Sequence, residues 1–127
     1  NLIHDKSATY GYPKELVSDG WALQGDWEVQ ADKIVSAKAH ASIKIHFNAK
    51  KVYMVMGNAS QLPLTAIIRL NSKPLKMNQG KDIHQSTITV DKHTLYEIVA
   101  LPESESAVLE IISSDTGLEI YTFTFGS

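Results

Sequence analysis

The stretch from Leu118 to Gly126 places the strongest single constraint on how this chain folds. From Tyr121 onward, aromatic residues alternate with threonine, so Tyr121, Phe123 and Phe125 fall on one side of an extended chain. Strict period-2 alternation of aromatic and β-branched residues is typical of a strand with one buried face. We therefore expect this stretch to lie inside a sheet, with the rest of the chain packed over its aromatic side.

Similar short segments recur along the chain at intervals of about ten residues, and polar turns separate them. The candidate strand segments are 21–29, 43–47, 51–56, 64–70, 87–90, 95–101, 108–112 and 118–126, together with 33–38 as a short strand or strand edge and 74–77 as the return of a hairpin. Turns are expected at 48–50, 57–60, 71–74 and 103–106, and Asn1 to Val17 is the least regular part. Because no helical periodicity is sustained, the pattern predicts an all-β sandwich or barrel of about eight or nine strands.

Side-chain parity along these strands predicts which residues form the core. The expected core residues are Phe47, Val52, Met54, Ile68, Ile98, Phe123 and Phe125. Gly25 interrupts the alternating segment 21–29, where a bulge or a close approach of backbone is expected.

Composition bounds the functional classes. The 127 residues carry a formal net charge of −2 and include no cysteine. A nearly neutral balance argues against binding to nucleic acid, and no apolar run reaches the length of a membrane-spanning helix. Without cysteine the chain has no disulfide, thiolate metal site or cysteine nucleophile. We expect residues 1–127 to form one domain, cut from a longer protein because the chain starts at Asn1 without methionine.

Five aromatic residues are candidates for ligand binding, because sugar rings stack on exposed aromatic faces. Trp21 and Trp27 are the first pair, although their shared parity with Leu23 and Val29 favours packing in the core. Tyr10 and Tyr12 lie in an expected loop, where binding residues concentrate, or they cover a sheet edge. Tyr53 is a further possible platform beside them.

The sequence offers no catalytic constellation and no metal-binding pattern. The closest histidines, His40 and His46, are six residues apart, and zinc requires several converging ligands. Asp82, Asp91 and Asp115 lie in expected loops, but they lack the spacing of an EF-hand. We therefore expect no catalytic residue, no metal and no cofactor.

Four stretches together resemble a known family. They are Trp21 to Trp27 (WALQGDW), Val52 to Gly57 (VYMVMG), Leu95 to Val99 (LYEIV) and Tyr121 to Gly126 (YTFTFG). In this order and spacing they resemble the C-terminal domain of DipZ-type thiol:disulfide interchange proteins and related redoxins. The resemblance covers roughly residues 20–126 and departs at Thr94, where the family often has arginine.

The resemblance implies an antiparallel jelly-roll β-sandwich, similar to galactose-binding domains and carbohydrate-binding modules. It also implies a position behind a thioredoxin-like domain with a Cys-x-x-Cys motif, outside the cytoplasmic membrane. The redox residues themselves are absent from this chain. The leading hypothesis is a non-catalytic binding or docking module for a glycan or a protein partner, with a shallow site near Tyr10 and Tyr12. The alternative is a structural appendage that packs on the redoxin domain or mediates dimerisation. An enzyme is disfavoured.

Overall fold

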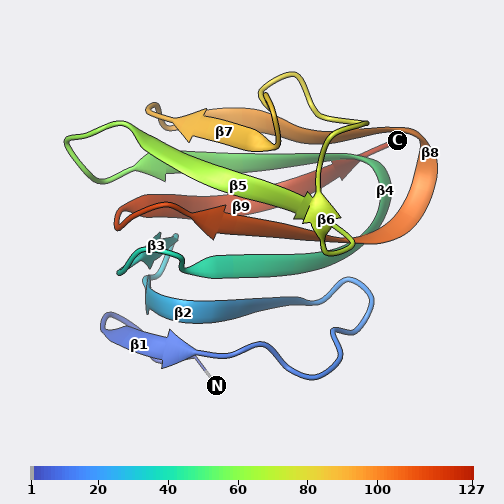
Figure 1. The fold of residues 1–127 in the computed structure, drawn as a ribbon. Coiled ribbons are helices and arrows are strands. Elements are labelled where there is room, and N and C mark those ends of the chain that lie inside the picture. Colours follow the sequence, from blue (N-terminus) through green and yellow to red (C-terminus); the bar gives the residue numbers. More distant parts are fainter. Residues whose placement is uncertain (1) are drawn as a thin grey trace.

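The computed structural model describes residues 2–127, which form nine strands and no helix (Figure 1). The strands are β1 Ser7–Tyr10, β2 Trp21–Val29, β3 Ile34–Ser36, β4 Ser42–Asn58, β5 Leu64–Leu70, β6 Lys73–Pro74, β7 Thr87–Val90, β8 Thr94–Ser113 and β9 Leu118–Gly126. All strand pairings are antiparallel, in the order β1-β2-β3-β9-β4-β8-β5-β6, with β7 on β5 and β2 also paired with β4. The expected all-β, antiparallel jelly-roll sandwich is confirmed.

Two long bent strands turn this network into two packed layers. The first part of β4 pairs with β2 and with the second part of β8, whereas Lys51 onward pairs with the first part of β8 and with β9. The register jumps at the bend, where Ala49 lies opposite Glu105 but Lys51 lies opposite Ala100. Figure 1 shows both strands turning at the same end of the molecule.

The bends correct two expected turns. Residues 48–50 and 103–106 lie inside β4 and β8, because the chain bends there while it continues as strand.

The N-terminal segment also contains a strand that the sequence pattern missed. In this strand, β1, Ser7 pairs with Glu28 and Tyr10 pairs with Gly25. The expected irregularity at Gly25 is confirmed. Its φ is 85°, and a Cβ there would lie 3.0 Å from the Cα of Ala41.

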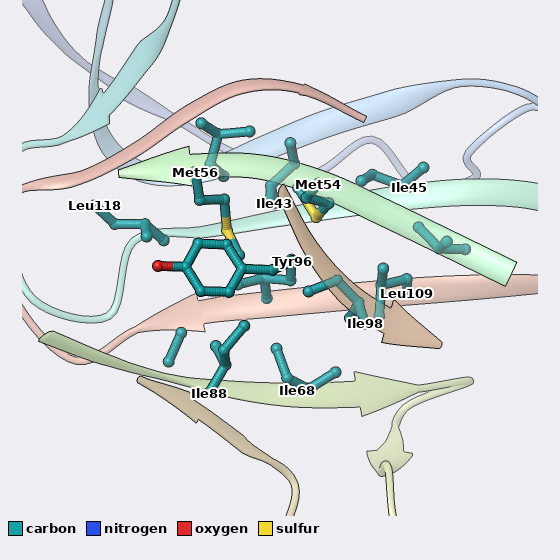
Figure 2. Close-up of a cluster of buried hydrophobic side chains, with 14 of the residues drawn as sticks. Ile43, Ile45, Met54, Met56, Ile68, Ile88, Tyr96, Ile98, Leu109 and Leu118 are labelled. Carbon is teal, nitrogen blue, oxygen red and sulfur yellow. The ribbon is translucent and has the colours of Figure 1, made fainter. Parts of the chain in front are cut away.

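The core lies between the two layers. Five of the expected core residues are fully buried, namely Phe47, Val52, Met54, Ile68 and Ile98. Figure 2 shows side chains from both layers, among them Met54 of β4 and Ile68 of β5, pointing into one shared space. Burial of apolar surface on this scale is the main force that holds the layers together.

The end of β9 departs from the expected core. Phe123 is half-buried against the core, and Phe125 is 41% exposed, so its assignment to the core is wrong. Val55 pairs with Thr122 and Met56 pairs with Ile120, which leaves Tyr121 as a bulge. The Tyr121 ring instead stacks on His93, with centroids 4.0 Å apart. The three aromatic residues therefore do not share one buried face.

Candidate functional site

A polar groove lies on the outer face of the layer that contains β2 and the first part of β4. Its volume is about 490 Å³. The groove is lined by Tyr12, Pro13, Lys14, Glu15, Leu16, Ala22, Lys44, His46, Asn71, Ser72 and Val108. Charged groups of both signs therefore face one hollow.

One wall of the groove is the segment 11–20, here called the N-terminal strap, which crosses the outer face of the sheet. The Tyr12 hydroxyl lies 2.6 Å from Ser42 Oγ and 2.9 Å from Glu110 Oε2. His46 contacts the backbone oxygen of Leu16 through Nδ1 at 2.9 Å, and its Nε2 lies 3.0 Å from Ser106 Oγ. These contacts hold the strap at two points. Tyr12 reaches from the strap to the sheet, and His46 reaches from the sheet to the strap.

The surroundings of the Tyr12 side chain favour a structural role, in which it anchors the strap to the sheet. Burial raises the pKa of its phenol well above the usual range, and the nearby Glu110 carboxylate adds to that rise. The Lys44 ammonium lies 4.6 Å from the centre of the Tyr12 ring. A cation at that distance from a ring face is attracted by its quadrupole. Tyr12 is thus a neutral, engaged side chain rather than a bare stacking platform.

A second hollow, here called the edge cleft, opens between β2, β3 and β9. Its volume is about 230 Å³, and its lining is largely apolar. It is lined by Leu2, Trp21, Val29, Gln30, Ala31, Asp32, Lys33, Ile34, Ile43, Ile120, Tyr121, Thr122 and Phe123. Leu2 is 42% exposed and Trp21 is 39% exposed, so large apolar side chains meet solvent at this cleft.

The five predicted aromatic residues do not form one site. Tyr12 lines the polar groove, whereas Tyr10 and Trp21 together line a small hollow beside the edge cleft. Trp27 is fully buried, and its Nε1 donates to the backbone oxygens of Gln24 at 3.0 Å and Ser42 at 3.2 Å. Tyr53 pairs with Thr124 in the other layer, away from both hollows.

Sequence reasoning missed most residues of the polar groove. Lys44 and His46 alternate with Ile43, Ile45 and Phe47, so the pattern placed them on the outer face of a strand. The groove arises only because the strap and the turn at 71–72 approach that face. No signal in the sequence shows which distant segment covers an exposed strand face.

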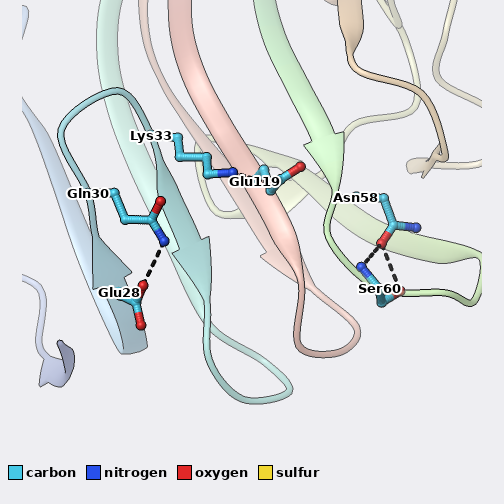
Figure 3. A network of polar contacts seen from close by, with 6 residues as sticks. All are labelled: Glu28, Gln30, Lys33, Asn58, Ser60 and Glu119. Atoms are coloured by element: carbon cyan, nitrogen blue, oxygen red, sulfur yellow. Dashed lines mark hydrogen bonds and ion pairs between the residues drawn. The ribbon is translucent and has the colours of Figure 1, made fainter. Parts of the chain in front are cut away.

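Polar contacts elsewhere have structural roles (Figure 3). Lys33 pairs with Glu119 at 2.5 Å, and this hydrogen bond raises the pKa of the Lys33 ammonium. Asn58 Oδ1 accepts hydrogen bonds from the backbone and the hydroxyl of Ser60, at 2.8 and 2.7 Å, which closes the turn after β4. Each of these groups is already satisfied by a neighbour in the fold.

Two of the three acidic loop residues likewise bind backbone. Asp82 accepts a hydrogen bond from the backbone nitrogen of Glu97 at 2.8 Å, and Asp115 accepts one from Thr116 at 2.7 Å. Within residues 2–127, no three His, Asp or Glu side chains converge as metal ligands. The same part of the chain contains no helix long and apolar enough to cross a membrane.

Comparisons with known proteins place this geometry in context. Residues 1–126 match the model of a family described as thioredoxin like C-terminal domain. Protein DipZ from Mycobacterium tuberculosis and Protein DipZ from Mycobacterium bovis are each 30% identical over 121 residues, which is 94% of this chain. The chain spans only 15% of the length of those relatives.

A structural comparison shows the same fold in a protein of different sequence. The solved structure of a family two carbohydrate esterase from Cellvibrio japonicus superposes with a TM-score of 0.67 at 13% identity. The match covers 83% of this chain and 30% of the esterase chain. At that identity the likeness concerns the fold alone.

Proposed function

We propose, from the premise that the chain belongs to the family of thioredoxin-like C-terminal domains, that it is a non-catalytic binding module of an extracytoplasmic thioredoxin-like protein. Residues 1–127 act as one domain, the C-terminal module of a longer chain. Disulfide exchange requires a thiolate, and this chain has no cysteine. Any thiol chemistry of the parent protein therefore belongs to another part of it, and this domain contributes binding.

The polar groove carries the proposal, and a short glycan is the ligand class that we assign to it. Within residues 2–127, the side chains of Lys14, Glu15 and Ser72 face the groove without a hydrogen bond to the chain. Sugar hydroxyls both donate and accept, so they suit a hollow that offers an ammonium, a carboxylate and a hydroxyl. The likeness to a carbohydrate esterase is a further reason to test glycans first.

The shallow, polar shape of the groove predicts a modest affinity for the ligand. The ring of Tyr12 forms part of the wall, and Lys44 lies over it. A shallow polar hollow buries few apolar contacts, and the loss of translational freedom on binding must still be offset. We therefore expect weak binding, with dissociation constants in roughly the millimolar range.

Titration of the labelled domain with peptidoglycan fragments and short oligosaccharides tests this function. Amide resonances of Tyr12, Lys44 and Ser72 are expected to shift together. Lys44→Ala should weaken binding about three- to tenfold, because it removes a charged hydrogen-bond donor from the groove. Lys92→Ala is the matched control, since Lys92 is an exposed lysine outside the groove. Shifts centred on Tyr53 or Trp21, or no shifts with any fragment, would reject the groove as a glycan site.

The edge cleft favours a second candidate function, which is association with another protein surface. Trp21 lines the cleft and is 39% exposed, and Leu2 beside it is 42% exposed. Large aromatic side chains exposed beside an apolar hollow mark protein interaction sites more often than solvated surface. The partner surface belongs either to the thioredoxin-like part of the parent protein or to a second copy of this domain.

A further inference from the structure

We propose that the free edge of β9 pairs with the same edge of a second copy, which joins two domains into a symmetric dimer through one continuous sheet. The inference rests on the second candidate function, association, and it names the partner. It is independent of glycan binding in the polar groove.

The edge is free because β3 is much shorter than β9. Along one side β9 pairs with β4 from Leu118 to Gly126. On its other side, only Glu119 and Ile120 pair with β3. The chain turns away before Ile34, where the backbone nitrogen of Gln30 bonds to the backbone oxygen of Lys33 at 2.8 Å. Within residues 2–127, the span 121–126 therefore has no backbone partner on this side.

Beyond the bulge at Tyr121, the span 122–126 lacks the devices that normally protect an exposed edge strand. Soluble proteins interrupt such edges with proline, with charged side chains, or with a covering loop. Here the sequence is Tyr-Thr-Phe-Thr-Phe-Gly, with no charge and no proline. A bulge occurs only at Tyr121, at the start of the free span. Residues of this type favour further strand pairing.

The sequence of the edge is symmetric about Phe123, which selects a second copy as the partner. In an antiparallel pair centred on Phe123, the Phe123 side chains of the two copies lie opposite each other. Thr122 then lies opposite the partner's Thr124, and Thr124 lies opposite the partner's Thr122. Aromatic pairs and threonine pairs directly opposite each other are both favourable cross-strand combinations. From Tyr121 to Phe125 each position thus meets a compatible residue, because Tyr121 lies opposite the partner's Phe125; the pairing stops before Ile120, which β3 already occupies.

The surface beside the edge supplies apolar contact that strand pairing alone does not. Phe125 is 41% exposed, and its ring lies 5.8 Å from that of Phe123. Trp21 and Leu2 are exposed at the cleft that Thr122 and Phe123 help to line. A second copy on the edge would lie next to these side chains. Stable interfaces require such apolar anchors in addition to backbone hydrogen bonds.

The test measures the mass of the domain by sedimentation over a range of concentrations, together with amide exchange. A concentration-dependent dimer is expected, with slower exchange of backbone amides in 121–126 as the dimer forms. The double variant Thr122→Lys with Thr124→Lys should weaken the dimer at least about tenfold, because lysines then face lysines across the pair. Both threonines are exposed, so folding of the single domain should be unchanged.

Two further variants make the test specific. Thr122→Glu with Thr124→Glu should also be monomeric alone, whereas a mixture of the lysine and glutamate variants should regain the dimer. Thr89→Lys with Thr94→Lys is the matched control, since both are exposed strand threonines outside β9, and it should dimerise normally. A monomer at every concentration would overturn the proposal. A dimer that the lysine pair leaves intact would overturn it equally.

Two measurements distinguish the dimer from the two functions proposed above. If the 121–126 amides become protected only when the thioredoxin-like part of the parent protein is added, that part is the partner and the dimer is rejected, although association stands. Glycan titration of the lysine variant reports on the polar groove separately, because β9 contributes none of its lining.

Discussion

The polar groove and the edge cleft differ in whether another segment of the chain covers the sheet beside them. At the groove, the strap covers the outer sheet face and is fastened by Tyr12 and His46. At the cleft, β3 begins only at Ile34, and apolar side chains remain open to solvent beside an unpaired strand edge. The polar groove, which the strap covers, presents polar groups that suit a small ligand. The edge cleft, which no segment of residues 2–127 covers, presents apolar area and unpaired backbone groups that suit another polypeptide.

The largest expected effect contrasts two neighbouring aromatic residues near the bend of β4. The Phe47 and Phe125 rings lie 6.1 Å apart, yet Phe47 is fully buried and Phe125 is 41% exposed. Phe47→Ala should lower the free energy of unfolding by about 3–5 kcal/mol because it leaves a cavity. Phe125→Ala should cost about 1 kcal/mol or less, because solvent fills its place. Urea titration of both variants at a concentration where the domain is monomeric measures the difference. Equal losses would mean that Phe125 is packed as tightly as Phe47.

A smaller effect is expected at the groove, where Tyr12→Phe removes a hydroxyl but keeps the ring. Ser42 is buried and Glu110 is half-buried, so both lose a partner that water replaces poorly. We expect a loss of about 1–2 kcal/mol and faster amide exchange in the strap. Tyr53→Phe is the control, because no hydrogen bond involves the Tyr53 hydroxyl within residues 2–127. Unchanged exchange in the strap would show that Tyr12 does not fasten it.

The smallest effect is the pH dependence of stability that Tyr12 gives to the groove. The folded pKa of Tyr12 lies above its unfolded value, which is near 10. The folded domain therefore holds this proton when the unfolded chain has lost it. The contribution of Tyr12 to stability is complete below about pH 10 and is lost as pH rises toward the folded pKa, with a slope of at most about 1.4 kcal/mol per pH unit. The stability difference between the wild type and Tyr12→Phe, measured by urea titration from pH 8 to pH 11 in roughly half-unit steps, should shrink over that alkaline range. A constant difference would contradict the assigned burial of the phenol.

Much of the fold was predictable because strand patterns are local. Alternation located β2, β5, β7 and β9, and parity identified the buried side chains of β4, including Val52 and Met54. The bends of β4 and β8 were mistaken for turns, since Asn48 to Lys50 and Glu103 to Ser106 have the composition of turns. A polar exposed segment can either reverse or bend, and only its partner strand determines which occurs.

The candidate site was less predictable for a related reason. Aromatic residues were singled out by type, but their exposure depends on what lies across from them. Trp21 and Trp27 share one strand and one parity, yet one is 39% exposed and the other is fully buried. Trp27 lies where β2 pairs with both β1 and β3, whereas Trp21 lies where β2 pairs with β4, beside the open cleft.

The sequence by itself therefore determined the class of the fold, the inward face of most strands and the lack of thiol chemistry, because each depends on residue type and local spacing. The tertiary structure alone decided where the strap lies, which aromatic residues face solvent and which strand edge stays open. Those properties arise from contacts between segments far apart in the chain, such as Tyr12 with Glu110 and Ile34 with Ile120. Local periodicity contains no information about such pairings, because every strand with a polar outer face is equally able to receive a covering segment.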